Sequence, residues 1–308
     1  MRAISIGAFD GVHLGHKEVI ERALNYARHV KGVKSAVLTF SPHPARFFKG
    51  KSFKLLTTEE EKEKILNSIG VDEVIKLTFN KNLANMPPEL FFKKILLDKL
   101  SVKFISIGFN FTFGKGGEGT PSLLAELAQR YGVAVEITPP KVIMGRIVSS
   151  TIIRKLVSEG KMGESALLLG RNYSLCGRVV RGDGMGKKLG FPTANLSIPP
   201  EKLLPPNGVY AAFARVGDKG FLGAMNIGYR PTIPGKEKKI TVEVHLLDFS
   251  GDLYDKIIEV EILRRIRPEK KFLSLEELKE QIEKDIEWVI RHYASILSDS
   301  STSLANLS

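Results

Sequence analysis

Residues 3–16 read AISIGAFDGVHLGH. The apolar residues at positions 3–9 predict a strand, and positions 14–30 repeat their apolar side chains at helical spacing. The glycines between these two segments allow a tight turn. In open α/β sheets, ligands bind where the carboxyl ends of strands meet the positive ends of helices. We therefore expect a ligand site at residues 7–16.

Short strands and longer helices alternate through the first half of the chain. Four further strands are predicted, at residues 35–40, 74–79, 104–109 and 133–138. Thr58 and Glu61 have the spacing of a capping box at the start of a second helix, and the pair Pro87-Pro88 can start a third. This alternation is typical of βαβ units, so it predicts an α/β domain with a doubly wound parallel sheet.

The second half shows a different pattern, in which strands follow one another across turn residues. They are predicted at residues 174–180, 209–216, 221–227, 241–249 and 257–263. No crossover helix separates them, which favours antiparallel pairing. Ser274, with Glu277 at the capping-box position, opens a closing helix over 274–297. We predict an antiparallel β-barrel, with a sandwich as the alternative, closed by this helix.

The change of pattern near residues 171–174 marks the expected domain boundary. It divides the chain into residues 1–172, residues 173–297 and a small polar tail at 298–308 that is expected to fray. The first part has 26 Lys and Arg against 16 Asp and Glu, and the remainder has 20 against 18. Because these positive residues are interspersed with acids, a surface that attracts anionic substrates is favoured over a nucleic-acid-binding surface.

Composition excludes several other classes of protein. With 43% hydrophobic and 26% charged residues, the chain has enough apolar material for one or two cores, so a disordered protein is excluded. Its uncharged apolar runs fall far short of the roughly 20 residues that span a bilayer. The N-terminus lacks the pattern of a secretory signal, and the single cysteine, Cys176, cannot form an internal disulfide. We expect a soluble cytoplasmic protein without a membrane partner.

The turn at residues 7–16 has the features of a phosphate site. Its glycines let phosphate oxygens approach the backbone, and His13 and His16 add donors at a helix start. Neither the P-loop pattern nor the G-x-G-x-x-G dinucleotide pattern is present. Two alternatives remain. The histidines can be metal ligands, although nothing supplies the third protein ligand of a zinc site, or they can simply cap a helix.

Three further segments are candidates for the same site. Ser149, Ser150 and Thr151 precede a helix with Arg154 on its first turn, and they offer hydroxyls, N–H groups and a cation to an anion, although Ser and Thr are also ordinary helix caps. The segment GFNFTFG, at 108–114, can flank a planar ring, although alternating phenylalanines are more often core residues. The segment SPHP follows the second strand and can form another wall.

Taken in order, GAFDGVHLGH, SPHP, GFNFTFG and SSTIIR resemble the adenylyltransferase module of prokaryotic bifunctional riboflavin kinase/FAD synthetases. The resemblance implies a Rossmann-like nucleotidyltransferase fold in which His13 and His16 act on the ATP phosphates. It implies that the following residues also bind ATP: Gly7, Phe9, Asp10, Gly11, Ser149, Ser150, Thr151 and Arg154. It implies flavin binding by Asn110 and Phe111, with Asn110 standing where many relatives have Asp.

The densest motif of the chain is GRVVRGDGMGKKLGFPTAN, at residues 177–195. It can form a mobile lid whose amides and positive charge contact phosphates. The lid residues in question are Gly182, Gly184, Gly186, Lys187 and Gly190. Thr193 and Asn195 follow on a rigid turn and offer a hydroxyl and an amide oxygen, which are hard ligands suited to Mg²⁺.

The segments NIGYRPT, VEVH, GDLY and RPEKKF complete a resemblance to the riboflavin kinase module, so that the two resemblances cover nearly the whole chain. They imply flavin binding by Arg230 and Phe272. They also imply that Glu243 is the general base that accepts the proton of a riboflavin hydroxyl. Without the resemblance, an acid between two valines would be interpreted as a strand glutamate facing water.

The resemblance as a whole implies a bifunctional enzyme. It would convert riboflavin and ATP to FMN in the C-terminal barrel, and FMN and ATP to FAD and pyrophosphate in the N-terminal domain, with Mg²⁺ as the metal. Its partners would be these small molecules rather than nucleic acid. The alternatives are a riboflavin kinase with an inert adenylyltransferase fold, an adenylyltransferase for another phosphate ester, and a basic nucleic-acid-binding protein.

Overall fold

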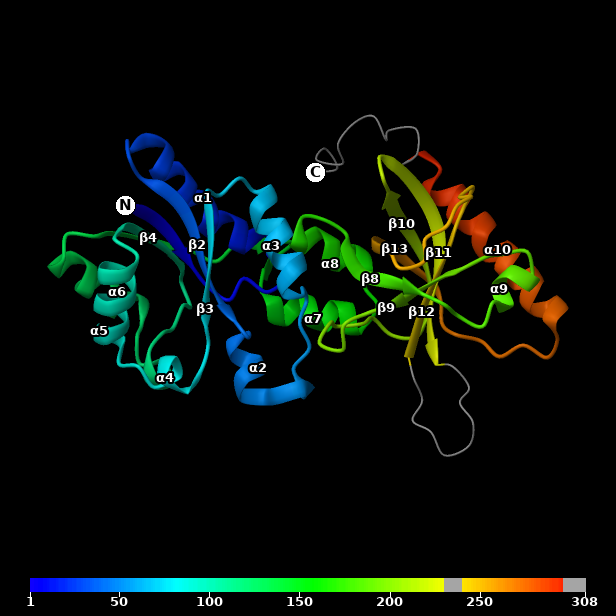
Figure 1. The fold of residues 1–308 in the computed structure, drawn as a ribbon, viewed down its shortest axis with the longest axis horizontal. Coiled ribbons are helices and arrows are strands. Elements are labelled where there is room, and N and C mark those ends of the chain that lie inside the picture. Colours follow the sequence, from blue (N-terminus) through cyan, green and yellow to red (C-terminus); the bar gives the residue numbers. More distant parts are fainter. Residues whose placement is uncertain (230–239, 296–308) are drawn as a thin grey trace. The chain divides into compact units, whose positions relative to one another are not determined.

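The computed structural model describes residues 1–229 and 240–295 (Figure 1). Contacts within the chain divide it into two compact units. The first comprises residues 1–153 with 168–170, and the second comprises 154–167 and the chain from 171 onward. This division places residues 154–167 with the second unit, although they precede the predicted boundary near 171–174. Among the described residues, no helix is long and apolar enough to cross a bilayer.

The first unit contains the predicted parallel sheet. Its strand order is β3-β2-β1-β4-β5, and every neighbouring pair is parallel. The strands are β1 (Arg2–Ile6), β2 (Lys34–Ser41), β3 (Glu73–Thr78), β4 (Val102–Gly108) and β5 (Ala134–Thr138). The first strand ends three residues before the predicted end, because Phe9 lies in a turn with a left-handed backbone (φ 50°).

Helices connect these strands and the two units. They are α1 (Leu14–His29), α2 (Pro44–Lys49), α3 (Glu59–Ser68), α4 (Lys81–Ala84), α5 (Pro88–Phe91), α6 (Pro121–Arg130), α7 (Ser150–Ser158) and α8 (Met162–Leu169). Helix α5 continues in π-helical turns over Phe92–Lys99, and the hairpin of β6 (Val142–Ile143) and β7 (Arg146–Ile147) precedes α7. The predicted capping box is present, since Thr58 and Glu61 each bond the other's backbone N–H.

Apolar side chains cover both faces of the parallel sheet. On one face, Ile4 of β1 belongs to a buried cluster with Leu96 of the π-helical turns. On the other, Val37 of β2 belongs to a cluster with Ile20 of α1 and Leu66 of α3. Each such side chain contributes about 1.5–3 kcal/mol when it is fully buried. The doubly wound arrangement predicted from the alternation of strands and helices is therefore confirmed.

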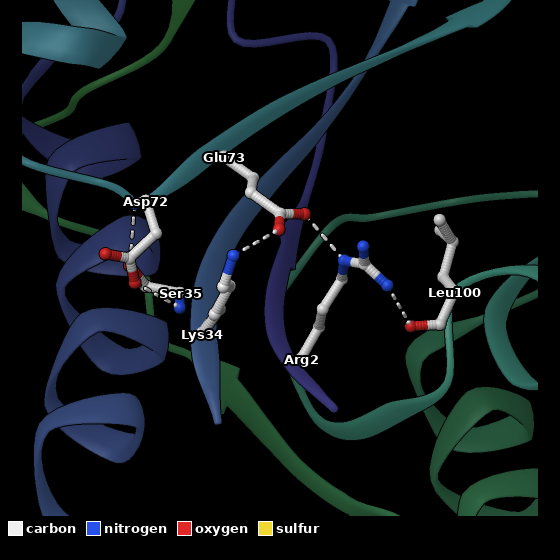
Figure 2. A network of polar contacts seen from close by, with 6 residues as sticks. All are labelled: Arg2, Lys34, Ser35, Asp72, Glu73 and Leu100. Atoms are coloured by element: carbon white, nitrogen blue, oxygen red, sulfur yellow. Dashed lines mark hydrogen bonds and ion pairs between the residues drawn. The ribbon is translucent and has the colours of Figure 1, made fainter. Parts of the chain in front are cut away.

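Polar contacts link the amino ends of β1, β2 and β3 (Figure 2). Arg2 Nε lies 2.7 Å from Glu73 Oε2, and Lys34 Nζ lies 3.5 Å from the other oxygen of this carboxylate. The Asp72 carboxylate accepts hydrogen bonds from the backbone N–H and the hydroxyl of Ser35, at 2.8 and 2.7 Å. These partners lower the pKa of Glu73 and of Asp72 below their ordinary values. The ionised carboxylates therefore stabilise the end of the sheet at which these strands begin, opposite their carboxyl ends.

The second unit is a closed six-stranded barrel, which confirms the predicted antiparallel barrel. Its strand order is β10-β11-β12-β9-β8-β13. The strands are β8 (Tyr173–Val180), β9 (Ala194–Ser197), β10 (Gly208–Val216), β11 (Lys219–Tyr229), β12 (Ile240–Leu246) and β13 (Ile257–Arg267). Strand β9 was not predicted. The predicted strand 241–249 ends at Leu246, because Asp248 has a left-handed backbone (φ 55°).

Helix α10 (Leu275–Tyr293) is the predicted closing helix, and Ser274 caps its first turn by accepting a hydrogen bond from Glu277 N. Val289 of this helix is buried, and its neighbour Ile290 is half exposed. The helix also buries Asp285, whose carboxylate binds the Arg267 guanidinium at the end of β13 at 2.7–3.1 Å. The helix ends at Tyr293, with Ala294 as its C-cap, whereas the predicted helix extends to 297. Residues 296 and 297 and the tail 298–308 lie outside the described residues.

Candidate active sites

The turn between β1 and α1 has an unusual backbone. Phe9, Gly11 and Val12 all have positive φ values, of 50°, 83° and 38°. Such values are costly for a β-branched residue such as Val12 and persist only where the surroundings impose them. A Cβ atom at Gly11 would lie 2.8 Å from the side chain of Leu56, so this position also requires glycine on steric grounds. The loop is therefore held in a specific shape by its neighbours.

Asp10 is one of the residues that hold this loop. Its side chain is only 3% exposed, and its carboxylate accepts hydrogen bonds from the backbone N–H groups of Leu56 and Thr57, each at 3.0 Å. The Gly11 N–H in turn donates to Thr57 Oγ1 at 3.0 Å. Asp10 thus joins the loop to the segment that precedes α3. Direct binding of ATP by Asp10 remains a prediction.

The two predicted histidines lie together at the start of α1. His13 is 5% exposed and caps the helix, because its Nδ1 accepts a hydrogen bond from His16 N at 3.1 Å. The two rings stack with their centroids 3.5 Å apart and their planes at 15°. Since Nδ1 of His13 is an acceptor, the neutral ring carries its proton on Nε2, where it can donate to a phosphate oxygen.

A cavity of about 430 Å³ lies at the carboxyl ends of β4 and β5. It brings together six of the predicted site residues: His13, His16, Asn110, Ser149, Ser150 and Thr151. Ser150 Oγ donates to the carbonyl of Asp10 at 2.8 Å, which ties the start of α7 to the turn. The cavity is also lined by Thr138 and Lys141, which were not among the predicted site residues. Thr138 ends β5 and Lys141 follows three residues later, so their place after a predicted strand could have indicated them.

Other residues predicted for this site lie outside the cavity lining. Phe111 stacks against Phe113 and packs on the hydrophobic core, whereas its neighbour Phe109 lines the cavity. Gly7 ends the first strand, where its N–H bonds to the carbonyl of Leu38. Arg154 follows on α7, within the residues that contacts assign to the second unit.

Aromatic side chains gather after β2, beside the segment SPHP. His43 caps α2 by accepting a hydrogen bond from Ala45 N at 3.0 Å, and its ring stacks on Phe53. Phe48 is 69% exposed, and its ring packs edge-on against Phe79. The segment SPHP is a predicted wall of the site, whereas Phe48 was not among the predicted residues. An exposed ring of this size offers a surface for stacking.

The second unit brings the predicted base and metal ligands together. Glu243 of β12 is paired with Asn195 of β9, and Thr193 Oγ1 donates to Glu243 Oε2 at 3.3 Å. A Cβ atom at Gly182 would lie 2.3 Å from the amide of Asn195, and one at Gly186 would lie 2.4 Å from the carbonyl of Phe191. The backbone contact therefore requires glycine at 186, and a side chain at 182 would displace the amide of Asn195.

The remaining lid residues lie in or beside the short helix α9 (Met185–Lys188). Gly184 and Gly190 flank it with left-handed backbones, at φ values of 70° and 90°, and Lys187 is exposed. His245 fixes the turn before Thr193, because its Nδ1 lies 2.8 Å from the carbonyl of Pro192. His245 lies on the outward face of β12 together with Glu243. The sequence could have indicated this, because both residues alternate with buried valines along the strand.

Of the two residues of this unit predicted to bind flavin, the structure describes Phe272 but not Arg230. The ring of Phe272 lies beneath the cations of Arg267 and Lys270, at 5.7 and 5.5 Å from its centroid. Arg230 lies outside the described residues. Phe272 is thus held at the corner between β13 and α10 that the ion pair of Arg267 and Asp285 fixes.

Two protein-family models match the chain, in sequence order. The model described as FAD synthetase matches residues 1–152, and the model described as riboflavin kinase matches residues 169–293. The first match contains the cavity with the two histidines. The second contains the barrel with Glu243.

Curated relatives match over nearly the whole chain. The bifunctional riboflavin kinase/FMN adenylyltransferase of Buchnera aphidicola is 40% identical over 295 residues and covers 94% of both chains. The protein of this name from Bacillus subtilis is 36% identical over 299 residues, covering 95% of this chain and 93% of its own. A crystal structure described as a macrolide-efflux protein from Streptococcus pneumoniae has a TM-score of 0.83 at 30% identity, covering 95% of this chain and 94% of its own.

Proposed function

The chain belongs to the family of bifunctional riboflavin kinase/FMN adenylyltransferases, and from this premise we propose which residues carry each of its two reactions. The enzyme phosphorylates riboflavin to FMN in its C-terminal part and adenylylates FMN to FAD in its N-terminal part. The observation that supports the residue assignment is that candidate groups for the two reactions gather at two places, at the cavity of the first unit and around Glu243 of the second. The predicted activities and their order are confirmed. A kinase with an inert first domain loses its support.

In the kinase reaction, Glu243 is the proposed general base. Its carboxylate accepts the proton of the riboflavin 5′-hydroxyl while the oxygen attacks the γ-phosphorus of ATP and ADP leaves. The contact from Thr193 Oγ1, at 3.3 Å, orients the carboxylate before substrate binds. The glycines and Lys187 of the lid enclose the phosphates, and Phe272 contacts the flavin. Arg230 is proposed for the same role from its sequence motif alone.

The oxygen atoms of Thr193 and Asn195 fit a magnesium ion. A hydroxyl and a side-chain amide oxygen beside the Glu243 carboxylate form a set of hard donors, and Mg²⁺ commonly completes its shell with water and substrate phosphates. No group of three or more His, Cys, Asp and Glu side chains that could hold a metal occurs in the part of the chain that the structure describes. When bound, the ion would neutralise charge on the ATP phosphates. We propose that Thr193 and Asn195 hold it.

In the adenylyltransferase reaction, an FMN phosphate oxygen attacks the α-phosphorus of ATP and pyrophosphate leaves. This nucleophile is already anionic, so the site needs to bring two anions together and stabilise charge rather than remove a proton. We assign this task to His13, His16 and the start of α7, which line one cavity. Gly7, Phe9 and Gly11 shape the turn, and Arg154 is proposed to add a cation.

The flavin side of this cavity is assigned to Asn110, which lines it, with Phe109 as the neighbouring ring. Phe111 packs against the core, so its proposed contribution is to support the turn that presents Asn110. The exposed ring of Phe48 offers a further stacking surface. All these substrates are small molecules, and we propose that the enzyme acts in the cytoplasm without a nucleic-acid partner.

A time course tests the two activities together. On incubation with riboflavin, ATP and Mg²⁺, we expect FMN to appear first and FAD later, because FMN is the product of one site and the substrate of the other. Chelation of divalent metal by EDTA is expected to stop both reactions. Chromatography of the flavins measures both steps. Accumulation of FMN alone, while ATP remains, would contradict an active first domain.

A truncated chain tests the domain boundary. A fragment that begins at Tyr173, the first residue of β8, contains the lid, the proposed metal ligands and Glu243, so we expect it to fold and to form FMN at a rate close to that of the full chain. A fragment that begins at Arg154 is the comparison, because contacts place residues 154–167 with the second unit. If only the longer fragment is active while both are folded, the boundary at 172/173 is wrong.

A further inference from the structure

Lys62 is a buried lysine next to the turn of the adenylyltransferase site. It lies on α3, and only 6% of its surface is exposed. Its Nζ atom donates to Thr39 Oγ1 at 3.1 Å and to the carbonyl of Ala8 at 3.4 Å. Thr39 Oγ1 itself donates to the same carbonyl at 3.2 Å. A cation from α3 and a hydroxyl from β2 thus converge on one backbone oxygen of the turn.

The charge of Lys62 also interacts with the carboxylate of Asp10, which holds the same turn. Burial lowers the pKa of Lys62, and the neighbouring carboxylates of Asp10 and Glu59 oppose this effect, while Lys76 adds to it. A buried ammonium is costly and is retained only where its partners compensate. A methionine would fill the same volume without that cost. The lysine therefore has a role that depends on its charge or its donors.

The contacts of the turn show which residues depend on Lys62 for their position. Lys62 binds the carbonyl of Ala8, Asp10 binds the segment at Leu56, and Ser150 binds the carbonyl of Asp10. Phe9, with its left-handed backbone, lies between these attachments, and the left-handed Gly11 and Val12 lie between Asp10 and His13. Release of one attachment would let the strained turn relax and would move the histidines that it carries.

We propose that Lys62 is a positioning residue for adenylyl transfer. It fixes the carbonyl of Ala8 from α3 and opposes the charge of Asp10, and through these two residues it sets the position of His13 and His16. This inference rests on the proposed function of the two histidines. Lys62 does not itself line the cavity or contact the ATP phosphates in this role.

The test replaces Lys62 by Met in the full-length enzyme, with Lys64→Met as the matched control on the exposed side of the same helix. Misplacement of a catalytic group by about 1 Å can cost on the order of 10²-fold in rate. We expect FAD formation from supplied FMN to fall by about this factor in kcat, with the KM for FMN unchanged. Formation of FMN from riboflavin is expected to stay intact. Lys64→Met should change neither reaction.

A variant without the two histidines distinguishes a positioning role of Lys62 from general destabilisation of the protein. In the variant His13→Asn with His16→Gln, the groups that Lys62 is proposed to position are absent, and Asn still offers a helix-capping side chain. Adding Lys62→Met to it should then cost little, because residues that act as a unit are not additive. An equal loss in both backgrounds, a raised KM for FMN, or no loss at all would overturn the inference.

The outcomes also distinguish this inference from the function on which it rests. If the histidine variant alone leaves FAD formation intact, the proposed role of the histidines fails. If the histidine variant is impaired and Lys62→Met is not, only the role of Lys62 fails. Should Lys62→Met not fold, Thr39→Val removes the hydroxyl that shares its contacts and keeps the side-chain shape. Its loss of kcat should likewise disappear in the histidine background, and persistence there would overturn the inference.

Discussion

Replacement of Glu243 by Gln is expected to lower FMN formation by about 10² to 10⁴, the usual contribution of general base catalysis. Glutamine keeps the shape of the side chain and an oxygen that can accept the hydrogen bond from Thr193, but it cannot take up the proton of the riboflavin hydroxyl. The measurement is the rate of FMN formation from riboflavin and ATP. FAD formation from supplied FMN should be nearly unchanged, because the cavity with His13 and His16 belongs to the other unit.

The control for this prediction is Glu283→Gln, which removes a carboxylate at an exposed position of α10 and should leave both reactions intact. If Glu243→Gln retains most of its kinase activity, Glu243 is the outward-facing strand glutamate that the sequence alone favoured. An equal loss of both reactions in a folded variant would argue against one reaction in each unit.

The folds of both halves could be predicted because their patterns depend on local spacing. Alternation along β12 buries Val242, Val244 and Leu246 and leaves Glu243 on the other face, as the sequence indicates. Strand β9 was missed for the opposite reason. It is four residues long, it carries the polar Asn195, and it pairs with β8 across the glycine-rich loop and with β12, which is remote in sequence.

Site residues could be predicted where they belong to a local sequence motif. They were harder to predict where tertiary contacts determine which side chains reach the cavity and which are buried. Phenylalanines at alternate positions of one strand would share a face, but a turn in which Phe111 N bonds to the carbonyl of Gly108 breaks the alternation. Phe109 therefore reaches the cavity while Phe111 joins the core. The burial of Asp10 and Lys62 is a further case, because their partners Leu56 and Thr39 lie more than twenty residues away along the chain.

Hydrophobic periodicity also cannot identify charged residues that lie in the core. Asp285 occupies a buried position of α10 only because Arg267 arrives there from the end of β13. This pair, with Phe272 over the same guanidinium, connects the closing helix to the proposed flavin contact. A helix predicted from its apolar face is thus positioned in part by an ion pair that the pattern of apolar residues does not contain.

Replacement of His13 and His16 together by Ala is expected to give the opposite result to Glu243→Gln. FAD formation from supplied FMN should fall by at least about 10²-fold, because removal of one preorganised donor to developing charge already costs that much. FMN formation should be unchanged. Assay of the two half-reactions in both variants gives a crossed test of the assignment.

The double alanine variant also removes the cap of α1, since His13 Nδ1 accepts a hydrogen bond from His16 N. Loss of a cap costs about 1 kcal/mol of stability, which is too little to explain a large loss of activity in a folded enzyme. His13→Asn with His16→Gln keeps a capping side chain and should show the same defect. His29→Ala, at an exposed position in the last turn of the same helix, should show none. If the capped variant recovers full FAD formation, the histidines serve the helix rather than the phosphates, and the adenylyl transfer must be assigned to the hydroxyls at the start of α7.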